Sequence, residues 1–302
     1  MYDIIIVGAG PAGLTAAIYA LRANKKVLLL EKGAFGGQMT YSPKIENYPG
    51  FESISGNELA DKMVQQALDL GADAEPENVI EISDNGSFKT VLTEERNNYT
   101  ALSVIIAAGA KHRRLGIENE EKFIGDGISF CAVCDGAFYE GKTVALIGGG
   151  NSALQEAVLL SDVCKKLYIV QNLAFLTGER KLCDILDEKP NVEIIYSSVV
   201  ESIPSDTLNS VTIKNTETNE LRTLDIDGMF VAIGLIPENE NFKNIAMLDE
   251  PGYIISDERC TTNTNGVFAA GDCRTKSVRQ VSTAIADGAS AAVAACRYID
   301  NL

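Results

Sequence analysis

Histidine is almost absent from this sequence, since His112 is the only one among 302 residues. A mechanism that depends on a histidine general base, or a zinc site built from several histidines, therefore has little to work with. No apolar run approaches the length that crosses a bilayer. Neither a basic region nor a cleavage motif precedes the strand-like segment Ile4-Ile5-Ile6-Val7. We therefore expect no secretory signal, no membrane partner and a cytoplasmic protein.

Positive charge is also scarce, with 26 Lys and Arg against 42 Asp and Glu and a formal net charge of −16. This balance argues against nucleic acid and anionic membrane surfaces as general partners. The hydrophobic content of 46% is too high for a disordered chain. It suffices for one large domain or two ordinary ones.

The seven cysteines do not form a disulfide framework, because their number is odd and five of them stand alone. The remaining two, Cys131 and Cys134, make a single Cys-x-x-Cys motif. A zinc ribbon needs a second such pair, which the sequence lacks. We therefore expect no metal site.

An order of strand, glycine-rich turn, helix and strand occurs twice along the chain. The first occurrence is 3–7, 8–13, a helix to about 23 and 27–30, and the second is 143–147, 148–153, a helix to about 160 and 167–170. Continuous apolar strands before glycine turns are typical of parallel sheets buried on both faces. Two such units about 140 residues apart predict two nucleotide-binding domains.

The remaining segments indicate how the two domains share the chain. An alternating stretch over 78–108 predicts a small antiparallel excursion, and apolar strands follow at 103–109, 227–234 and 266–272 before an Ala-rich helix from Val281 to about Tyr298. We predict an α/β fold of two Rossmann-like, three-layer ββα domains, the second inserted into the first. Residues 1–111 and 241–302 form the first domain, and residues 112–240 form the second.

The first glycine turn, Gly8-Ala9-Gly10-Pro11-Ala12-Gly13, matches the dinucleotide fingerprint G-x-G-x-x-G. Its glycines permit a tight turn and a close approach to a pyrophosphate, which the helix N-terminus binds through free N–H groups. Glu31 ends the next strand, where a carboxylate can accept hydrogen bonds from ribose hydroxyls. The alternative is a plain structural turn, which this context disfavours.

Cys131 and Cys134 are spaced so that one helical turn brings both thiols to the same face. Such a pair suits a reducible disulfide, and a helix N-terminus lowers the pKa of a thiol enough to make it a nucleophile. Asp135 adds a carboxyl group that can donate a proton when a thiolate leaves. The alternatives are two unrelated structural cysteines or a zinc site.

With these motifs in place, the whole chain resembles the low-molecular-weight thioredoxin reductases. The segments that carry the resemblance are 8–13, Gly36-Gly37-Gln38, Glu46-Asn47-Tyr48-Pro49-Gly50-Phe51, Cys131-Ala132-Val133-Cys134-Asp135-Gly136, 148–153, Gly271-Asp272 and Arg279-Gln280-Val281. The resemblance implies a homodimer that uses FAD to reduce thioredoxin. It also implies that the first domain binds FAD and that the second is the NADPH-type domain with the redox pair.

The resemblance assigns roles to individual residues. It implies that Cys134 faces the flavin, that Cys131 attacks the partner disulfide and that Asp135 is the acid. Gly36, Gly37, Gln38 and Asn47 would line the isoalloxazine, and Asp272 would bind the ribitol. The complete cofactor set expected is Gly8, Gly10, Pro11, Ala12, Gly13, Glu31, Gly36, Gly37, Gln38, Asn47, Ala108, Gly109, Gly271, Asp272, Arg279, Gln280 and Val281.

One segment departs from the family pattern. NADPH-dependent members carry His and Arg after the second strand of the inserted domain, whereas this chain has Gln171, Asn172 and Leu173 and no positive charge before Arg180. A 2′-phosphate there would lack its guanidinium partner. The chain is therefore most like the ferredoxin-dependent flavin thioredoxin reductases, and reduced ferredoxin is the donor we expect. NADPH with a rearranged phosphate site is the alternative.

Two further alternatives concern the reaction and the docking of the donor. A non-catalytic flavin redox sensor would keep the site but not the turnover, and a flavoprotein reductase without a dithiol is disfavoured by the cysteine pair. An acidic ferredoxin needs a local basic patch on this acidic chain. The cations that could supply one are Lys111, His112, Arg113, Arg114, Arg274, Lys276 and Arg279.

Overall fold

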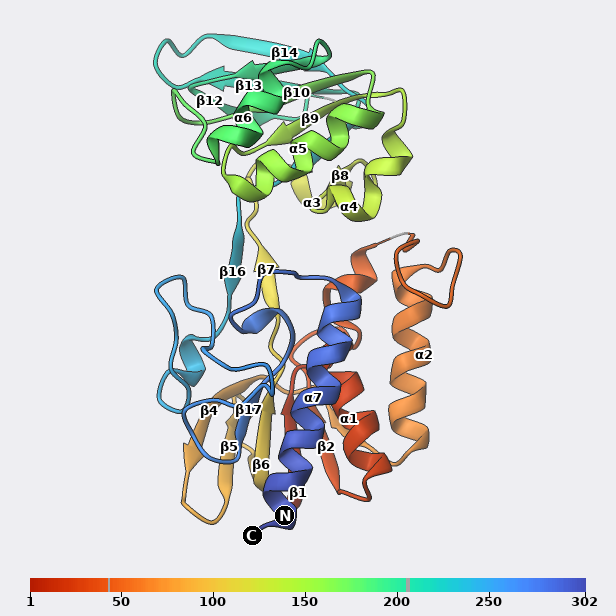
Figure 1. Cartoon of the computed structure of the whole chain (residues 1–302), viewed down its shortest axis with the longest axis vertical. Coiled ribbons are helices and arrows are strands. Elements are labelled where there is room, and N and C mark those ends of the chain that lie inside the picture. Colours follow the sequence, from red (N-terminus) through yellow and green to blue (C-terminus); the bar gives the residue numbers. More distant parts are fainter. Residues whose placement is uncertain (43, 205–206) are drawn as a thin grey trace. The chain divides into compact units, whose positions relative to one another are not determined.

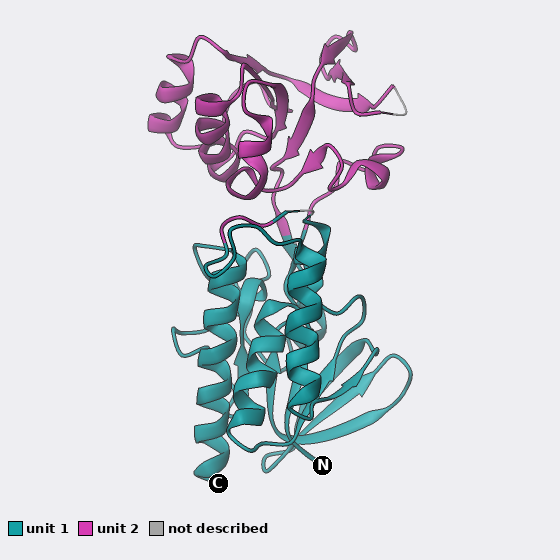
Figure 2. Ribbon diagram, turned by 90° about the vertical axis from the view of Figure 1, so that its right-hand side faces the viewer, with its two compact units in different colours: residues 1–44, 48–111, 236–302 teal, residues 45–47, 112–235 magenta. Residues whose placement is uncertain are grey.

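The structure is a computed structural model that describes residues 1–42, 44–204 and 207–302. It divides into two compact units, one of Met1–Lys44, Tyr48–Lys111 and Ile236–Leu302, the other of Ile45–Asn47 and His112–Leu235 (Figure 2). The second unit thus ends before residue 240, where the sequence pattern placed its boundary. Asn239 gives the physical reason, because its buried side chain donates hydrogen bonds to the carbonyls of Gly252 (2.9 Å) and Cys273 (2.8 Å) in the first unit.

A sheet with strand order β3-β2-β1-β6-β5-β4 is the centre of the first unit, and β17 also pairs with β6 (Figure 1). The strands are β1 Tyr2–Val7, β2 Val27–Leu30, β3 Asp73–Glu75, β4 Val79–Asp84, β5 Lys89–Thr93, β6 Asn98–Ile106 and β17 Val267–Ala269. The pairings of β1 with β2 and β6, of β2 with β3 and of β17 with β6 are parallel. β5 and β4 add antiparallel strands, as the alternating sequence predicted.

Helices cover one face of this sheet in the first unit. They are α1 Pro11–Arg22, α2 Gly56–Asp69 and α7 Val281–Asp300, and the short helical turns are η1 Gly37–Tyr41, η3 Glu240–Phe242 and η4 Gly271–Cys273. α7 packs along α1, and Ala291, Ala292 and Ala295 in α7 are completely buried because small side chains permit a close approach (Figure 1). The apolar strands are buried on both faces, as the continuous run Ile4, Ile5 and Ile6 shows at 0% exposure.

A parallel sheet with strand order β11-β10-β9-β15-β8 is the centre of the second unit. Its strands are β8 Ile128–Ser129, β9 Thr143–Ile147, β10 Lys166–Val170, β11 Val192–Ile195 and β15 Gly228–Val231. The helices are α3 Glu120–Phe123, α4 Ala132–Asp135, η2 Gly136–Tyr139, α5 Asn151–Val163 and α6 Arg180–Asp187, and the strands β12 Ser198–Ser202, β13 Ser210–Asn215 and β14 Leu221–Asp225 form an antiparallel sheet.

The core of the second unit has two halves, one on each face of its parallel sheet. On one face Leu146 and Ile169 pack against α5 and α6. On the other, Ala145 and Met229 pack against the antiparallel sheet. The result is a three-layer α/β unit, so the predicted fold class is confirmed.

Two short strands carry the chain between the units. β7 (Ala110–His112) pairs with β16 (Leu235–Pro237), so the outgoing and returning segments lie side by side. Within the described ranges, no helix combines the length and the apolar character needed to cross a membrane.

Candidate redox and cofactor sites

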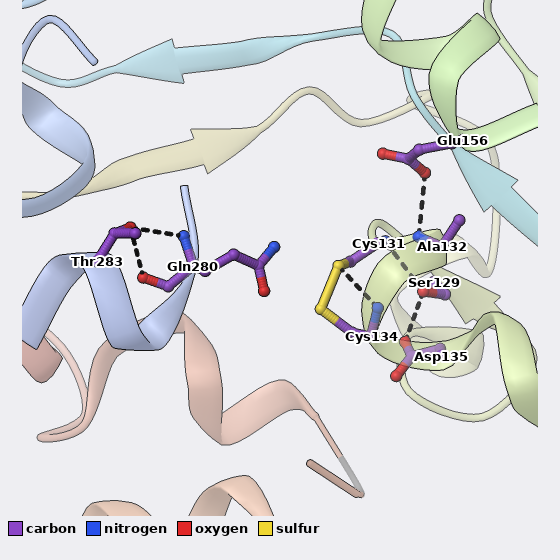
Figure 3. The surroundings of a disulfide bond; sticks show 8 residues. All are labelled: Ser129, Cys131, Ala132, Cys134, Asp135, Glu156, Gln280 and Thr283. Atoms are coloured by element: carbon purple, nitrogen blue, oxygen red, sulfur yellow. Dashed lines mark hydrogen bonds between the residues drawn. A yellow bond between two sulfur atoms is a disulfide. The ribbon is translucent and has the colours of Figure 1, made fainter. Parts of the chain in front are cut away.

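Cys131 and Cys134 form a disulfide at the start of α4, with their Cα atoms 5.3 Å apart. Cys131 is the N-cap residue of this short helix, and the N–H of Cys134 donates a hydrogen bond to Cys131 Sγ at 3.2 Å (Figure 3). An N–H group directed at sulfur stabilises a thiolate at that position. The structure therefore brings the pair together on one helical turn, as its spacing indicated.

Asp135 lies next to the pair and is linked to it through Ser129, which the sequence analysis did not single out. Ser129 Oγ donates to Asp135 Oδ2 at 2.6 Å and accepts from the N–H of Cys131 at 3.1 Å (Figure 3). The other oxygen, Asp135 Oδ1, is buried and has no hydrogen-bond partner among the described residues. Burial raises the pKa of Asp135 although Ser129 opposes the shift. The carboxyl group is thus suited to carry a proton.

Glu156 is a second carboxyl group at residues 131–135, which we call the redox turn, and it was not among the predicted site residues. Its Oε2 accepts a hydrogen bond from the N–H of Ala132 at 3.1 Å (Figure 3). Burial raises the pKa of Glu156 to about 7. Helical spacing gives a signal for it, because Glu156 lies between Ala153 and Leu160 on the face of α5 that is buried.

The first glycine loop has the geometry of a phosphate cradle. A Cβ on Gly8 would lie 2.3 Å from the carbonyl oxygen of Ala107, and one on Gly13 would lie 1.8 Å from the oxygen of Gly8. Gly10 is the N-cap of α1 and makes no side-chain capping bond, while Pro11 occupies the first turn, where its missing N–H is no loss. The N–H groups at this helix start are available to an anion.

The carboxylate of Glu31 braces this loop. Its Oε2 accepts from the N–H of Ala9 at 2.7 Å and its Oε1 accepts from the N–H of Gly33 at 2.8 Å. The segment after it also returns to the loop, since the N–H of Gly36 donates to the carbonyl of Ala9 at 2.8 Å. Gln38 donates to the carbonyl of Ala110.

The end of the chain adds a buried acid to the same unit. A Cβ on Gly271 would lie 2.8 Å from Cβ of Ala12, so the turn η4 packs onto the start of α1. Burial raises the pKa of Asp272, and among the described residues nothing bonds to its buried Oδ1. A buried carboxylate oxygen without a hydrogen-bond partner can accept a hydrogen bond from a ligand hydroxyl.

The expected cofactor residues thus fall into two groups. The first unit contains all of them except Asn47, which groups with the second unit. Arg279 lies 4.2 Å from the centroid of Tyr253, and Gln280, the N-cap of α7, donates its N–H to Thr283 Oγ1 at 3.1 Å (Figure 3). Val281 is the first residue of α7, and Ala108 and Gly109 follow β6. Their roles toward a cofactor stay predictions.

The second glycine loop has the same backbone design but a different neighbour. A Cβ on Gly148 would lie 2.5 Å from the carbonyl oxygen of Ala232. Gln171, at the end of β10, is only 4% exposed and fills the space beside Gly149, where a Cβ would lie 2.6 Å from its amide. Its Nε2 donates to the carbonyl of Phe175 at 3.0 Å and its Oε1 accepts from the N–H of Asn172 at 3.1 Å. Gln171 therefore holds its own loop in place.

Most of the cations considered for docking are engaged within the protein. Lys111 pairs with Glu238 at 2.9 Å, and Asp287 accepts from Lys276 at 2.8 Å and Arg274 at 3.3 Å. Burial and the charge of Arg114 lower the pKa of His112 to about 4, so this side chain is neutral at pH 7.

The other five cysteines have no place in the redox turn. Cys164, Cys183, Cys260, Cys273 and Cys296 are free thiols, and all but Cys183 are buried. Burial raises the pKa of Cys273 to about 11 and that of Cys260 to about 12. Such thiols are inert at neutral pH.

Comparison with known proteins agrees with this geometry. Residues 2–288 match the family model of the pyridine nucleotide-disulphide oxidoreductases. A thioredoxin reductase of Listeria innocua is 42% identical over 100% of this chain and 95% of its own length. A 34.2 kDa protein in the rubredoxin operon of Clostridium pasteurianum is also 42% identical, over 98% of this chain and 97% of its own.

A solved structure extends the similarity to the fold. The thioredoxin reductase of Streptococcus pyogenes superposes with a TM-score of 0.94 and is 40% identical, and the match covers 100% of this chain and 99% of that one. Similarity in sequence and similarity in fold to thioredoxin reductases both extend over the full length of the chain. The protein is therefore an enzyme of the pyridine nucleotide-disulphide oxidoreductase family, a family of flavoproteins.

Proposed function

We propose that this enzyme is an FAD-dependent thioredoxin reductase that passes electrons through Cys131 and Cys134 to the disulfide of thioredoxin. The observation that carries the proposal is the disulfide at the start of α4. Beside it lies Asp135, whose Oδ1 accepts no hydrogen bond among the described residues and can therefore hold a proton. The thioredoxin reductases among its relatives support the choice of partner.

The residues of the first unit fit FAD, and we assign that unit as the FAD-binding domain. The N–H groups at the start of α1 suit a pyrophosphate, and Glu31 suits a ribose. The buried Oδ1 of Asp272 suits a hydroxyl of the ribitol chain. When bound, FAD supplies a ring system that takes up and releases electrons singly or in pairs.

In the proposed exchange the thiolate of Cys131 attacks one sulfur of the thioredoxin disulfide. A bond forms between Cys131 and that sulfur, the thioredoxin S–S bond breaks, and the leaving sulfur takes a proton, which we assign to Asp135. The Cys134 thiol then attacks Cys131 Sγ, and the bond between Cys131 and the thioredoxin sulfur breaks. The proton lost by Cys134 passes to that sulfur, so the Cys131–Cys134 disulfide is restored and the second thioredoxin thiol is released. The N–H of Cys134, 3.2 Å from Cys131 Sγ, supports Cys131 as the nucleophile.

Replacing Cys131 with Ser tests this assignment. We expect Cys131→Ser to abolish thioredoxin reduction and to leave reduction of the flavin intact, whereas Cys183→Ser, which removes a free thiol of the same unit, leaves both intact. If thioredoxin turnover survived in Cys131→Ser, the pair would not lie on the path. If the unmodified enzyme bound thioredoxin without turning it over, the protein would be a flavin redox sensor.

For the electron donor we propose reduced ferredoxin. The supporting observation is Gln171, which occupies the strand end beside the second glycine loop with an uncharged, buried side chain. A 2′-phosphate bound there would find no guanidinium before the exposed Arg180, which pairs with Asp184. Because Lys111, Arg274 and Lys276 are held in ion pairs, we expect the rate of ferredoxin-driven reduction to depend only weakly on salt.

NADPH is the second candidate donor, since the second glycine loop keeps the close packing of Gly148 against Ala232. Anaerobic stopped-flow of the flavin-loaded enzyme separates the two donors. Flavin bleaching by reduced ferredoxin, and none by micromolar NADPH or NADH, is the expected result. Fast bleaching by NADPH and none by ferredoxin would overturn it.

The proposal extends to assembly and location. We propose a homodimer, in keeping with the resemblance of the whole chain to this reductase family, and sedimentation velocity of the loaded enzyme tests it. We also propose that the enzyme works in the cytoplasm, because its five free thiols suit a reducing compartment.

A further inference from the structure

Glu156 is a titratable group at the redox turn to which the exchange reaction above gives no role. It belongs to α5, which packs against α4, and its carboxylate accepts the N–H of Ala132 at 3.1 Å (Figure 3). Ala132 directly follows Cys131 and is 5% exposed, so the hydrogen bond lies beneath the redox turn. Asp135 reaches the preceding N–H, that of Cys131, through Ser129. One carboxyl group thus holds the N–H of Ala132 directly, and the other is linked to the N–H of Cys131 through Ser129.

The environment of Glu156 brings its pKa close to neutral pH. Burial raises its pKa to about 7, the N–H of Ala132 opposes this shift, and the charge of Asp135 adds to it. A group with this pKa is about half ionised at pH 7. Its charge therefore changes over the pH range in which thiols begin to ionise.

Three cations belong to the elements packed against α5, and two of them are held in ion pairs. The elements packed against α5 are α4, η2, α6, β9 and β10. Their titratable residues are Cys134 and Asp135 on α4, with Cys131 as its N-cap, Tyr139 on η2, Arg180, Lys181, Cys183, Asp184 and Asp187 on α6, and Lys166 and Tyr168 on β10. Arg180 pairs with Asp184 and Lys166 pairs with Glu193.

We propose that Glu156 is a positioning residue of the redox turn, whose ionised carboxylate holds the N–H of Ala132 and suppresses ionisation of the Cys131 thiol in the reduced enzyme. Two effects combine. A negative charge close to a thiol disfavours a second negative charge on sulfur. The N–H that Glu156 occupies is also withheld from the thiolate. The inference rests on the proposed use of Cys131 as the exchange thiol.

The test measures how readily Cys131 ionises, without turnover. In the flavin-loaded Cys134→Ser enzyme, Cys131 is the one thiol left of the pair, and its alkylation by iodoacetamide is followed by mass spectrometry from pH 5 to 10. Adding Glu156→Gln, which keeps an acceptor for the N–H of Ala132 but removes the charge, should move the midpoint of the alkylation profile down by about half to one pH unit. Because Glu156 is about half ionised at pH 7, the rate there should rise by up to about twofold.

Two further variants keep the inference open to failure. Glu188→Gln removes an exposed carboxylate of the same unit and should leave the midpoint unchanged. Glu156→Ala removes both the charge and the hydrogen bond, and should also lower the midpoint. An unchanged midpoint in Glu156→Gln, or an effect confined to Glu156→Ala, would overturn the proposal, since the charge would then not act on sulfur. Thioredoxin turnover, measured separately with both cysteines present, reports on the proposed function itself.

Discussion

The two glycine loops share a backbone design and differ at the end of the neighbouring strand. In both, the first glycine donates its N–H to the last residue of that strand, from Gly8 to Leu30 at 2.7 Å and from Gly148 to Val170 at 2.9 Å. The next residue is Glu31 in one case and Gln171 in the other. Glu31 presents a carboxylate that accepts the N–H of Ala9 in the loop and that of Gly33 in its own segment, whereas Gln171 turns inward and bonds to its own segment alone.

The comparison distinguishes the packing that forms a glycine loop from the side chains that let the loop bind a nucleotide. Close strand–helix packing is common to both loops, so it follows from the fold. Only the first loop has a charged residue at the end of the neighbouring strand. It also has Gly13 as the third glycine of the fingerprint, where the second loop has Ala153. We therefore expect the first loop to depend on its exact shape and the second to tolerate change.

The largest effect should come from Gly13→Ala. Its Cβ would lie 1.8 Å from the carbonyl oxygen of Gly8, so α1 or the loop must move, and we expect a loss of about 3 kcal/mol of folding free energy together with loss of FAD. Denaturant unfolding and flavin absorbance measure both. In the second loop the position of Gly13 already holds Ala153, so the variant there is Gly150→Ala, whose Cβ meets Thr177 at an ordinary 3.7 Å and which should cost about 1 kcal/mol or less. Equal losses in the two variants would contradict the expected difference in tolerance between the two loops.

Glu31→Ala should weaken FAD binding about tenfold to a hundredfold, because it removes the ribose acceptor, the hydrogen bond to Ala9 in the loop and the hydrogen bond to Gly33. Fluorescence titration of the apoprotein with FAD measures the change. Glu52→Ala removes an exposed carboxylate of the same unit and is the matched control. If FAD binding were unchanged in Glu31→Ala, the strand-end charge would have no part in the difference between the loops.

Positive charge added to the second loop should increase its affinity for NADPH. Asn172 and Leu173 are exposed, so Asn172→Arg with Leu173→Arg can be introduced without disturbing the core. We expect the concentration of NADPH that half-reduces the flavin to fall about tenfold, with no change for NADH, because a guanidinium binds the 2′-phosphate. If this concentration of NADPH did not change in the double variant, the missing positive charge would not be what limits the use of NADPH.

The smallest effect should follow Gln171→Ala. It removes two hydrogen bonds and the filling beside Gly149, so we expect the free energy of unfolding to fall by about 1 kcal/mol. Thermal or denaturant unfolding measures this, with the exposed Asn172→Ala, expected to change by less than about 0.5 kcal/mol, as the control. No change in Gln171→Ala would mean that its buried amide does not hold the loop.

Local pattern was enough to predict most of the fold. Apolar runs and glycine turns predicted β1, β2, β9 and β10 to within a residue, because such strands are buried on both faces and leave no room for polar side chains. The earlier end of the second unit was not predictable, because the hydrogen bonds of Asn239 reach residues distant in sequence.

The redox site was predictable only in part. The Cys131–Cys134 pair and Asp135 follow from spacing along one helical turn. Ser129 and Glu156 were missed, because each acts through a backbone N–H whose partner depends on how β8 and α5 pack against α4. A carboxylate on the buried face of a helix was the available signal for Glu156.

The insertion of one unit into the other sets the order in which parts of the molecule become available during synthesis. The first unit cannot complete its sheet or cover it until β17 and α7 leave the ribosome, since both come from the last forty residues of the chain. By then the segment that carries Cys131 and Cys134 has already been made, and domains generally fold as units during translation. The turn with Asp272 and the start of α7 arrive last. Cofactor capture should therefore be a late event, and a chain released early would carry the cysteine pair without a completed flavin site.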